Sequence, residues 1–394
     1  MPEHRRRSRR VPVVAAGATL LVLIGLAIAF TTTSDDDEPA AAPTVSASPS
    51  ASAFSLGPAV TAFPSPSPSP SLSPPSSPVD PRSARRMLAL SRPNGTWPGA
   101  HGLSGVNGDP SLDTPSVKAF CTARGRPCTV AQTYTDRSSW SAMTAGTGWT
   151  FENFADFDGV LVISQGLVPD GDQADLAACA AGDHDADFKA FGTLMRTHNR
   201  ADSIIRLGWE FNEQTSSWRA DDTTTWLSCY HRAADSIRAT NPSVLFDWTI
   251  NAHDTPDGVC GGLSTNCYPG DDYVDIVGID NYDHYPWSPT AASFDRTAAA
   301  PEGLTWLYNF ARKHNKPFSV GEWGVVPTAD VGKENPNFIT WMHTWLAAHA
   351  QHLAYETYFS DCGSGGVQSS LYRTDPTCTR NPASARRYAS LFGA

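Results

Sequence analysis

Short apolar runs, rich in β-branched and aromatic residues, recur across residues 83–394 and alternate with stretches of helical periodicity. Amphipathic segments such as Thr224–Thr240 and Pro336–Ala350 fall between the runs. This alternation is typical of β/α units around a parallel sheet. We count eight such runs: Met87–Ser91, Thr129–Thr133, Val160–Ser164, Ile204–Gly208, Val244–Thr249, Val274–Asp280, Phe318–Gly321 and Ala354–Phe359. Eight units in about 300 residues predict an α/β fold of the (β/α)8 TIM-barrel type.

An open, doubly wound α/β sheet is the alternative arrangement of such units. That fold usually carries a glycine-rich phosphate-binding turn after its first strand. The segment Arg92–Gly95, which follows the first predicted run, has no such glycine pattern. We therefore favour the barrel, in which reacting groups lie at the carboxyl ends of the strands.

Glutamates stand at the ends of the fourth and seventh predicted strands. Alternate residues of an extended strand share a side, which places Arg206, Glu210 and Asn212 together. Glu213 is one position out of phase, whereas Glu322 is in phase with the inward side of the seventh run. Strands four and seven face each other across an eight-stranded barrel. Two carboxyl groups about 5–5.5 Å apart are what a retaining glycosidase needs.

The two glutamates are expected to differ in protonation. A nucleophile must stay ionised, and Glu322 has Arg206 to lend it charge and Tyr282 to donate a hydrogen bond. Glu210 lies beside this ionised carboxylate and next to the apolar Trp209, so like charge and desolvation should raise its pKa. We assign Glu322 as the nucleophile and Glu210 as the acid/base.

Three stretches carry a resemblance to a known family over about residues 85–380. They are Arg206-x-x-x-Glu-Phe-Asn212, the segment Tyr268–Tyr282 that ends in Ile-Asp-Asn-Tyr, and Gly321-Glu-Trp-Gly324. Together they resemble glycoside hydrolase family 26, of clan A. The resemblance implies a retaining enzyme acting on β-linked mannans, with some xylanases and lichenases in the family. It also implies that Glu210 is the acid/base, Glu322 the nucleophile and Tyr282 the residue that orients the nucleophile.

The sequence departs from the family pattern beside the acid/base. Family mannanases usually have His before this Glu, where the chain has Trp209, and Gly after the Asn, where it has Glu213. Clan relatives outside the family commonly place the acid/base directly after an Asn, which would select Glu213 instead. Strand phase favours Glu210. The identity of the sugar stays open at this point.

Aromatic residues near the predicted mouth are candidates for stacking on sugar faces, because pyranose rings present C–H groups that pack on flat rings. The candidates are Trp209, Trp218, Trp248, Trp287 and Trp323. Trp209 and Trp323 adjoin the two carboxylates, which favours contact with substrate. For Trp248, inside a predicted strand, a place in the core is nearly as well supported.

The charge of the chain excludes one class of partner. The formal net charge is −11, and residues 1–79 contribute nothing to it, because five Arg balance five acidic residues. A strongly acidic globular part argues against nucleic-acid binding. His343, His349 and His352 lack the four-residue step of a zinc pair, and we expect neither a metal nor another cofactor.

The first 82 residues differ from the rest. Residues 1–30 combine the cationic cluster Arg5–Arg10 with the uncharged segment Val11–Phe30, which is long enough to cross a bilayer. Such a pattern serves as an uncleaved anchor, which we favour, or as a cleavable export signal. Residues 31–82 are rich in Ser and Pro and predict a disordered linker, about 160 Å long if extended. Residues 83–394 form the predicted catalytic domain, which we expect outside the cell.

All eight cysteines lie in the part of the chain expected to be exported, which predicts disulfides rather than free thiols. Short separations suggest the pairs Cys121–Cys128, Cys260–Cys267 and Cys362–Cys378, and these leave Cys179 with Cys229. The pairs are expected to fasten loops.

The leading prediction is an exported retaining β-glycanase whose partner is a polysaccharide and which acts as a monomer. Two other functions fit the sequence. A barrel that binds cell-envelope glycan without cleaving it would keep the aromatic residues but would not need both carboxyl groups. An enzyme that remodels the organism's own envelope polysaccharide would suit an anchor followed by a linker.

Overall fold

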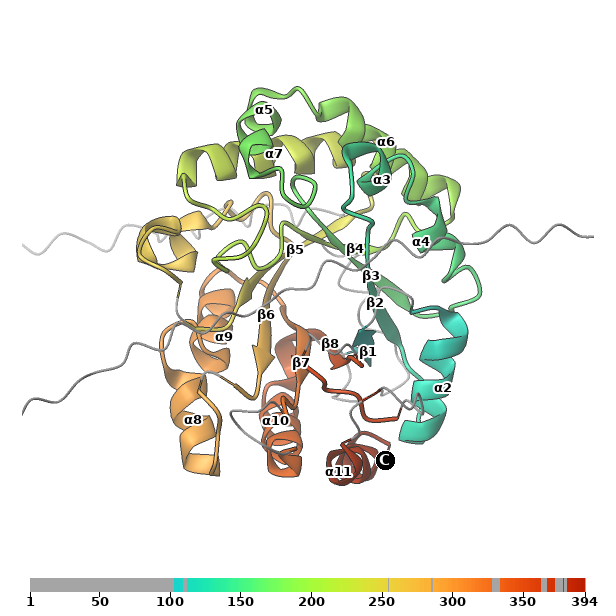
Figure 1. The fold of residues 1–394 in the computed structure, drawn as a ribbon, viewed down its shortest axis with the longest axis vertical. Coiled ribbons are helices and arrows are strands. Elements are labelled where there is room, and N and C mark those ends of the chain that lie inside the picture. The colour runs from blue at the N-terminus through green and yellow to red at the C-terminus, as the bar shows by residue number, and fades with distance from the viewer. Residues whose placement is uncertain are drawn as a thin grey trace, which may run out of the picture. The chain divides into compact units, whose positions relative to one another are not determined.

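The computed structural model describes residues 103–393 except 109–111, 254, 285, 328–333, 363–366, 373–377 and 379–380. Eight parallel strands follow one another in chain order and close into a barrel, because β1 pairs with both β2 and β8 (Figure 1). The strands are β1 Leu103–Gly108, β2 Val130–Tyr134, β3 Val160–Gln165, β4 Ile204–Leu207, β5 Leu245–Asn251, β6 Ile276–Tyr282, β7 Phe318–Gly324 and β8 Leu353–Ser360. The predicted (β/α)8 fold is confirmed.

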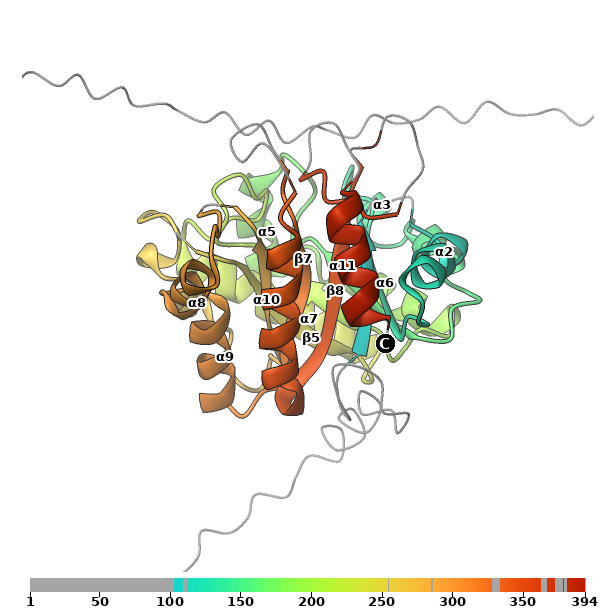
Figure 2. The same ribbon diagram turned by 90° about the horizontal axis from the view of Figure 1, so that it is seen from below.

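Helices surround the strands on the outside of the barrel. Figure 2 shows α10 and α11 side by side along β7 and β8. The helices are α2 Thr114–Arg124, α3 Trp140–Met143, α4 Gly148–Glu152, α5 Leu176–Ala181, α6 Asp185–Thr197, α7 Thr223–Thr240, α8 Ala291–Ala299, α9 Leu304–Lys313, α10 Pro336–Ala348 and α11 Pro382–Phe392. Polar side chains fix several of the helix starts: Asp222 caps α7 through the backbone N–H of Thr225.

Seven of the eight predicted strands overlap the observed ones, but the first was misplaced. Met87–Ser91 lies outside the described residues, and the strand between β8 and β2 is β1 instead. Its sequence, Leu-Ser-Gly-Val-Asn-Gly, has little of the β-branched and aromatic character used to find strands. Gly105 is nevertheless required there, because a Cβ at this position would lie 1.7 Å from the carbonyl oxygen of Val130.

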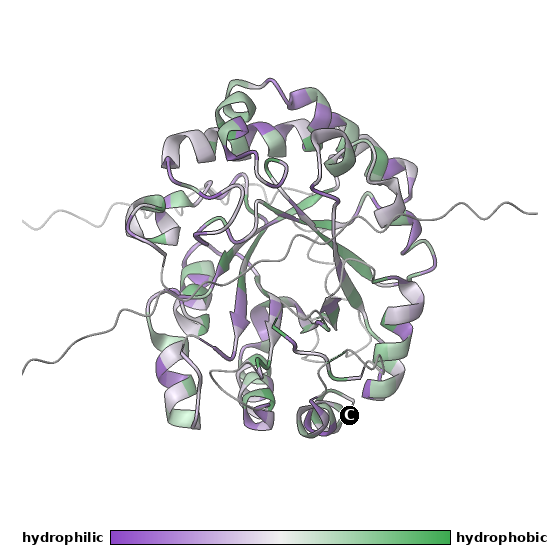
Figure 3. Cartoon of the chain, viewed as in Figure 1, coloured by the Kyte–Doolittle hydropathy of each residue, from purple (hydrophilic) through white to green (hydrophobic). Residues whose placement is uncertain are grey.

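The inside of the barrel changes character along its axis. Near the amino ends of the strands it is closed by buried apolar side chains: Leu103, Val130, Val160, Val162, Ile204, Leu245, Ile276, Ala354 and Tyr355. Toward the carboxyl ends, buried polar residues such as Arg206, Asp280 and Glu322 replace them. The same change is visible in Figure 3, where the carboxyl end of β6 turns from green to purple. A polar site therefore opens at the carboxyl face.

The cysteines pair as predicted: Cys121–Cys128, Cys179–Cys229, Cys260–Cys267 and Cys362–Cys378. Among the residues that the structure describes, no helix has both the length and the apolar character that a membrane span requires. The predicted N-terminal segment 1–30 and the linker 31–82 lie outside the described residues.

Candidate active site

Glu322, buried on β7, is held by three donors from three different strands. Its Oε1 accepts a hydrogen bond from Arg206 Nη1 at 2.7 Å and from the hydroxyl of Tyr134 at 2.7 Å. Its Oε2 accepts from the hydroxyl of Tyr282 at 2.8 Å. Desolvation raises the pKa of both tyrosines, and the negative charge of Glu322 raises it further, so both keep their protons and remain donors.

Arg206 is the cation of this site. It is fully buried on β4, where it ion-pairs with Glu322 and Asp280 and donates to Ser164 Oγ at 2.9 Å. Burial disfavours its charge, but the charges of Asp280 and Glu322 outweigh burial and raise the pKa of Arg206 well above its usual range. The guanidinium is thus a permanent positive charge beside Glu322.

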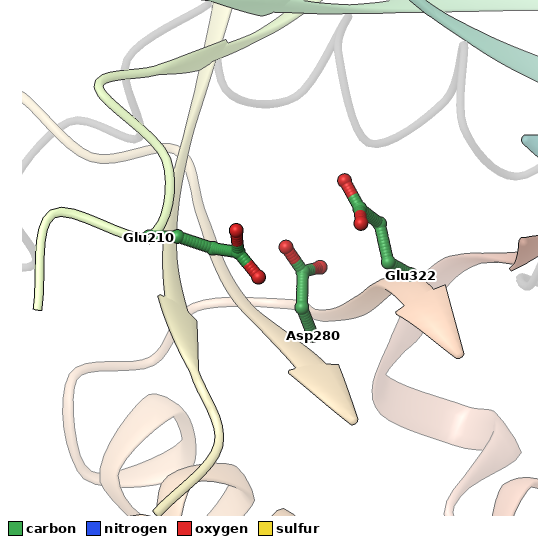
Figure 4. Close-up of side chains that lie close together, drawn as sticks. All are labelled: Glu210, Asp280 and Glu322. Atoms are coloured by element: carbon green, nitrogen blue, oxygen red, sulfur yellow. The ribbon is translucent and has the colours of Figure 1, made fainter. Parts of the chain in front are cut away.

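Glu210 approaches the same cluster from the other side of the mouth. One carboxylate oxygen each of Glu210, Asp280 and Glu322 lie within 4.8 Å of one another (Figure 4). Burial and the charge of Glu322 raise the pKa of Glu210 to about 8. A carboxyl group with this pKa carries a proton at neutral pH and can give it away.

The backbone places Glu210 differently from the prediction. The extended strand β4 ends at Leu207, and Gly208 and Glu210 adopt left-handed conformations, with φ of 57° and 51°. The alternation expected to run on from Arg206 to Glu210 and Asn212 is therefore wrong beyond Leu207. A positive φ at a non-glycine residue is rare and costs energy, and such positions cluster at functional sites. The turn is held by the backbone N–H of Glu210, which donates to the carbonyl of Thr249 at 3.0 Å.

Glu213, the alternative acid/base, is not part of this cluster. Its carboxylate accepts from the backbone N–H of Thr215 at 2.5 Å and from the Thr215 hydroxyl at 2.7 Å, within its own loop. The geometry therefore brings Glu210, not Glu213, together with Glu322.

Three of the residues predicted to bind substrate are placed elsewhere. Asn212 is 2% exposed. Its side-chain amide forms hydrogen bonds with the backbone of Asn251 and with the hydroxyl of Thr255, and thereby connects two loops.

Two of the tryptophans predicted to bind substrate, Trp323 and Trp248, are 0% exposed. Trp323 follows the inward-facing Glu322, so it points outward, donates to Glu356 Oε2 at 2.6 Å and packs on aromatic residues of α10 and α11. Trp248 packs in the same way outside β5, against Phe211, Tyr268 and Phe310. As sugar platforms, both tryptophans were predicted wrongly.

Trp209 and Trp218 form an aromatic wall at the mouth. Their ring centroids are 4.6 Å apart, and that of Trp209 is 5.6 Å from that of Tyr134, whose hydroxyl binds Glu322. Arg137 lies over both indoles, at 5.3 and 5.9 Å from their centroids, and pairs with Asp170. The exposed fractions are only 6% for Trp209 and 4% for Trp218, so little of either ring is open to a sugar.

Sequence reasoning missed Tyr134 and Asp280. Tyr134 ends β2, and Asp280 lies two residues before Tyr282 on β6, on the same side of that strand. The alternation used to select the glutamates, applied to the other strands, would have found both residues. Tyr134 in addition lay just beyond the end of the predicted second run.

Glu210, Asp280 and Glu322 are the one carboxylate group in the described ranges with a spacing that suits a metal ion. Two of the three carboxylates already bind Arg206. A guanidinium built into the chain thus supplies the positive charge that such a cluster requires. We therefore base no chemistry on a metal.

The fold and site together define a class of protein. A closed (β/α)8 barrel carries a glutamate that accepts hydrogen bonds from Arg206, Tyr134 and Tyr282 on its seventh strand, and a glutamate with a raised pKa after its fourth. The model of glycosyl hydrolase family 26 matches residues 223–354, which confirms the resemblance predicted from the sequence. Over these residues, about a third of its length, the chain is similar to this family of glycoside hydrolases.

Curated relatives are distant and much longer. Endoglucanase H of Acetivibrio thermocellus is 27% identical over 125 residues, which are 32% of this chain and 13% of that protein. A mannan endo-1,4-beta-mannosidase of Bifidobacterium adolescentis is 22% identical over 263 residues, which are 62% of this chain and 25% of that protein. The chain thus spans at most about a quarter of the length of these two relatives.

Solved structures support the fold. An endo-beta-1,4-mannanase double mutant of Cellulomonas fimi matches with a TM-score of 0.55 and 16% identity, covering 79% of this chain and 75% of that one. The catalytic domain of an endo-beta-1,4-mannanase of Bacillus sp. JAMB-750 gives a TM-score of 0.55 and 14% identity, with coverages of 79% and 90%. At these identities the likeness concerns the barrel alone.

Proposed function

We propose that this chain hydrolyses β-linked polysaccharide with net retention of configuration, by double displacement at Glu322 and Glu210. One observation carries the proposal: Glu322, held by three close hydrogen-bond donors, and Glu210, whose pKa is about 8, have oxygens within 4.8 Å of each other. Retaining enzymes use a short carboxyl separation, of about 5–5.5 Å, and inverting enzymes about 6.5–9.5 Å.

In the first step, a carboxylate oxygen of Glu322 attacks the anomeric carbon of the sugar. The glycosidic C–O bond breaks, and Glu210 transfers its proton to the departing oxygen. Hydrogen bonds from Arg206 and from the hydroxyls of Tyr134 and Tyr282 orient the Glu322 carboxylate for this attack. The product of this step is a covalent glycosyl ester on Glu322.

In the second step, Glu210 acts as a base. It takes a proton from water, the water oxygen attacks the anomeric carbon, and the ester bond to Glu322 breaks. Loss of charge on Glu322 in the ester lowers the pKa of Glu210, because the repulsion that raised it has gone. Glu210 is therefore an acid in the first step and a base in the second. Asp280, which ion-pairs with Arg206, keeps the guanidinium in place throughout.

The sugar that we propose first is β-linked mannose. The mannosidase of Bifidobacterium adolescentis and the Cellulomonas fimi mannanase carry this activity in their names. Endoglucanase H, a second relative, is named for a glucan, so glucans with β-linkages come next. Trp209 stands where family mannanases usually have His, and an indole beside Tyr134 gives this side of the mouth an apolar wall.

A screen for released reducing ends over mannan, xylan, lichenan and β-1,3-glucan tests this function. We expect release from at least one of these glycans by the wild type and none by Glu322→Ala. Binding of the same glycans without release by the wild type would favour the non-catalytic binding barrel instead. Release that survives in Glu322→Ala would exclude the proposed nucleophile.

We propose further that the catalytic domain acts outside the cell, as a monomer, behind the N-terminal segment 1–30 and the linker 31–82. The four disulfides support an oxidising compartment. Fractionation of cells that express the full chain tests this point. We expect the enzyme at the cell surface or in the medium, and its recovery with reduced cysteines from the cytoplasm would contradict the proposal.

A further inference from the structure

A further buried carboxylate, that of Asp247, lies in the barrel interior outside the cluster of Glu210, Asp280 and Glu322. Asp247, on β5, is 0% exposed and accepts hydrogen bonds from residues of three strands. Its Oδ2 accepts from Ser319 Oγ and from the hydroxyl of Tyr355, both at 2.6 Å. Its Oδ1 accepts from Thr249 Oγ1 at 3.0 Å. The chemistry proposed above does not use this carboxylate.

Space for Asp247 is made by a glycine. A Cβ on Gly278 would lie 2.5 Å from Asp247 Oδ1, 2.4 Å from Ser319 Oγ and 2.7 Å from Thr249 Oγ1. At this level a TIM barrel usually holds bulky branched side chains. Here the interior holds a carboxylate with three hydroxyl donors, an arrangement that is costly to bury unless each group is satisfied.

The hydroxyl of Thr249 links Asp247 to the active site. Arg206 Nε donates to Thr249 Oγ1 at 3.3 Å, and the same oxygen donates to Asp247 Oδ1. A hydroxyl has one proton and two lone pairs. Since Asp247 takes the proton of Thr249, the Thr249 oxygen can only accept from Arg206.

The hydrogen bond from Arg206 Nε to Thr249 fixes the orientation of the guanidinium plane. Arg206 is planar, and its Nη1 and Nη2 must face Glu322 and Asp280 at the same time. A hydrogen bond from Nε to Thr249, on a third side of the guanidinium, prevents the guanidinium plane from rotating. Without this bond, Arg206 Nη1 is held less firmly in its position opposite Glu322 Oε1.

We infer that Asp247 is a positioning residue: through Thr249 it locks the orientation of Arg206 and thereby the position of Glu322. The kinetic test of this inference rests on the proposed function. The hydrogen bonds themselves can be tested without catalysis, by proton exchange at Arg206 Nε. Burial raises the pKa of Asp247 above its ordinary value, and the hydrogen bonds from Ser319 and Tyr355 and the charge of Arg206 only partly oppose this rise.

Thr249→Val tests the link, with Thr150→Val as its matched control. Both threonines are buried, at 1% and 0% exposed, and both changes remove one hydroxyl without changing the volume much. Thr150 lies on α4, where its hydroxyl bonds Thr147 at 2.9 Å, outside the barrel interior. Asp247→Asn completes the set, alone and combined with Thr249→Val.

The kinetic experiment measures kcat and KM on the glycan that the wild type hydrolyses fastest. For Thr249→Val we expect kcat to fall roughly tenfold with KM within about twofold. Asp247→Asn should do the same, and the double variant should add little, because the two residues act as one unit.

Exchange of the Arg206 Nε–H proton with solvent, followed by NMR of the whole protein, is independent of activity. We expect exchange at least about tenfold faster in Thr249→Val than in the wild type or in Thr150→Val. A kcat and an exchange rate in Thr249→Val equal to those of Thr150→Val would overturn the inference. If Asp247→Asn does not fold, this pair of valine variants still decides. If the wild type cleaves no glycan, the proposed function fails, and the exchange measurement alone decides the role of Asp247.

Discussion

The ends of β4 and β7 each present one carboxyl group to the same mouth, but they do so in different ways. β7 stays extended through Gly324, and Glu322 sits within it with three hydrogen-bond donors. β4 stops at Leu207, and Glu210 stands on a left-handed turn where the charge of Glu322 and burial raise its pKa. The end of β7 surrounds Glu322 with hydrogen-bond donors, whereas the turn after β4 leaves Glu210 in surroundings that raise its pKa. One barrel rim thereby holds a hydrogen-bonded carboxyl group and a proton donor side by side.

The largest loss of activity is expected from replacing Glu322, the proposed nucleophile on β7. Glu322→Gln keeps the size of the side chain but cannot form the glycosyl ester, so kcat should fall by roughly 10⁴-fold. Initial-rate assays on the best glycan measure this loss. The fold should be unaffected, as thermal unfolding checks. A kcat within tenfold of the wild type would mean that another residue is the nucleophile.

Removing the proton donor should depend on the leaving group. Glu210→Ala should lower kcat/KM on polysaccharide by roughly 10²–10⁴-fold. Aryl glycosides whose leaving group departs without a proton should show a much smaller loss in the first step. Glu213→Ala is the matched control, since its carboxylate binds only its own loop, and it should retain near wild-type rates. A larger loss of kcat/KM in Glu213→Ala than in Glu210→Ala would mean that Glu213 is the acid/base.

The donors around Glu322 should contribute smaller effects. Tyr282→Phe and Tyr134→Phe each remove one hydrogen bond to the charged carboxylate, at 2.8 and 2.7 Å. Such bonds contribute about 1.5–3 kcal/mol, which corresponds to roughly 10–100-fold in kcat/KM. Initial-rate assays on the best glycan measure these losses. A kcat/KM within about twofold of the wild type in both variants would show that Arg206 alone holds Glu322 in position.

The proton on Glu210 predicts an alkaline limit. A general acid works only while protonated, and burial and Glu322 raise the pKa of Glu210 to about 8. The value of kcat/KM should therefore decline as pH rises through about 8, well above the usual carboxyl range. Measuring kcat/KM between pH 4 and pH 10 (roughly the span of the relevant groups) checks this. A decline that begins near pH 5 would contradict the raised pKa.

The smallest effect concerns stability, away from the mouth. Burial raises the pKa of Glu356 from its ordinary 4.5 to about 7, so ionisation is unfavourable in the folded state. Its cost appears as pH rises from about 4.5 to about 7 and persists above that range. Glu356→Gln should raise the melting temperature by roughly 2–4 °C at pH 8 and leave it unchanged near pH 4. Equal shifts at both pH values would point to packing instead of charge.

The sequence predicted most of the barrel because seven strands carry strong β-branched patterns. It missed β1, where contact with β2 requires Gly105 and the apolar signal is weak. For the site, strand alternation selected Glu322, although the alternation is interrupted on β7. Ser319, three residues earlier, also faces the barrel interior, and the pairing with β6 shifts by one residue between Val320 and Glu322. At Glu210 alternation selected the residue that lies beside Glu322 through a premise that also fails, since β4 ends three residues earlier.

Aromatic residues were the least predictable part. Trp323 adjoins Glu322 in the sequence but lies on the opposite side of the strand, packed under α10 and α11. Proximity along the chain does not distinguish the inside of a barrel from the outside, whereas strand phase does. Arg206 was expected beside Glu322 and lies there, but its partners Asp280 and Thr249 come from other strands. Such partners depend on the strand register, which the composition of a run does not reveal.

The stereochemistry of the first product tests the central claim most directly. Proton NMR during hydrolysis of the best β-linked glycan shows the anomeric form of the newly released reducing end before it equilibrates. Attack by Glu322 followed by attack of water through Glu210 predicts that the β-anomer appears first. Initial appearance of the α-anomer would mean a single displacement by water, and would contradict the account of Glu322 as a nucleophile.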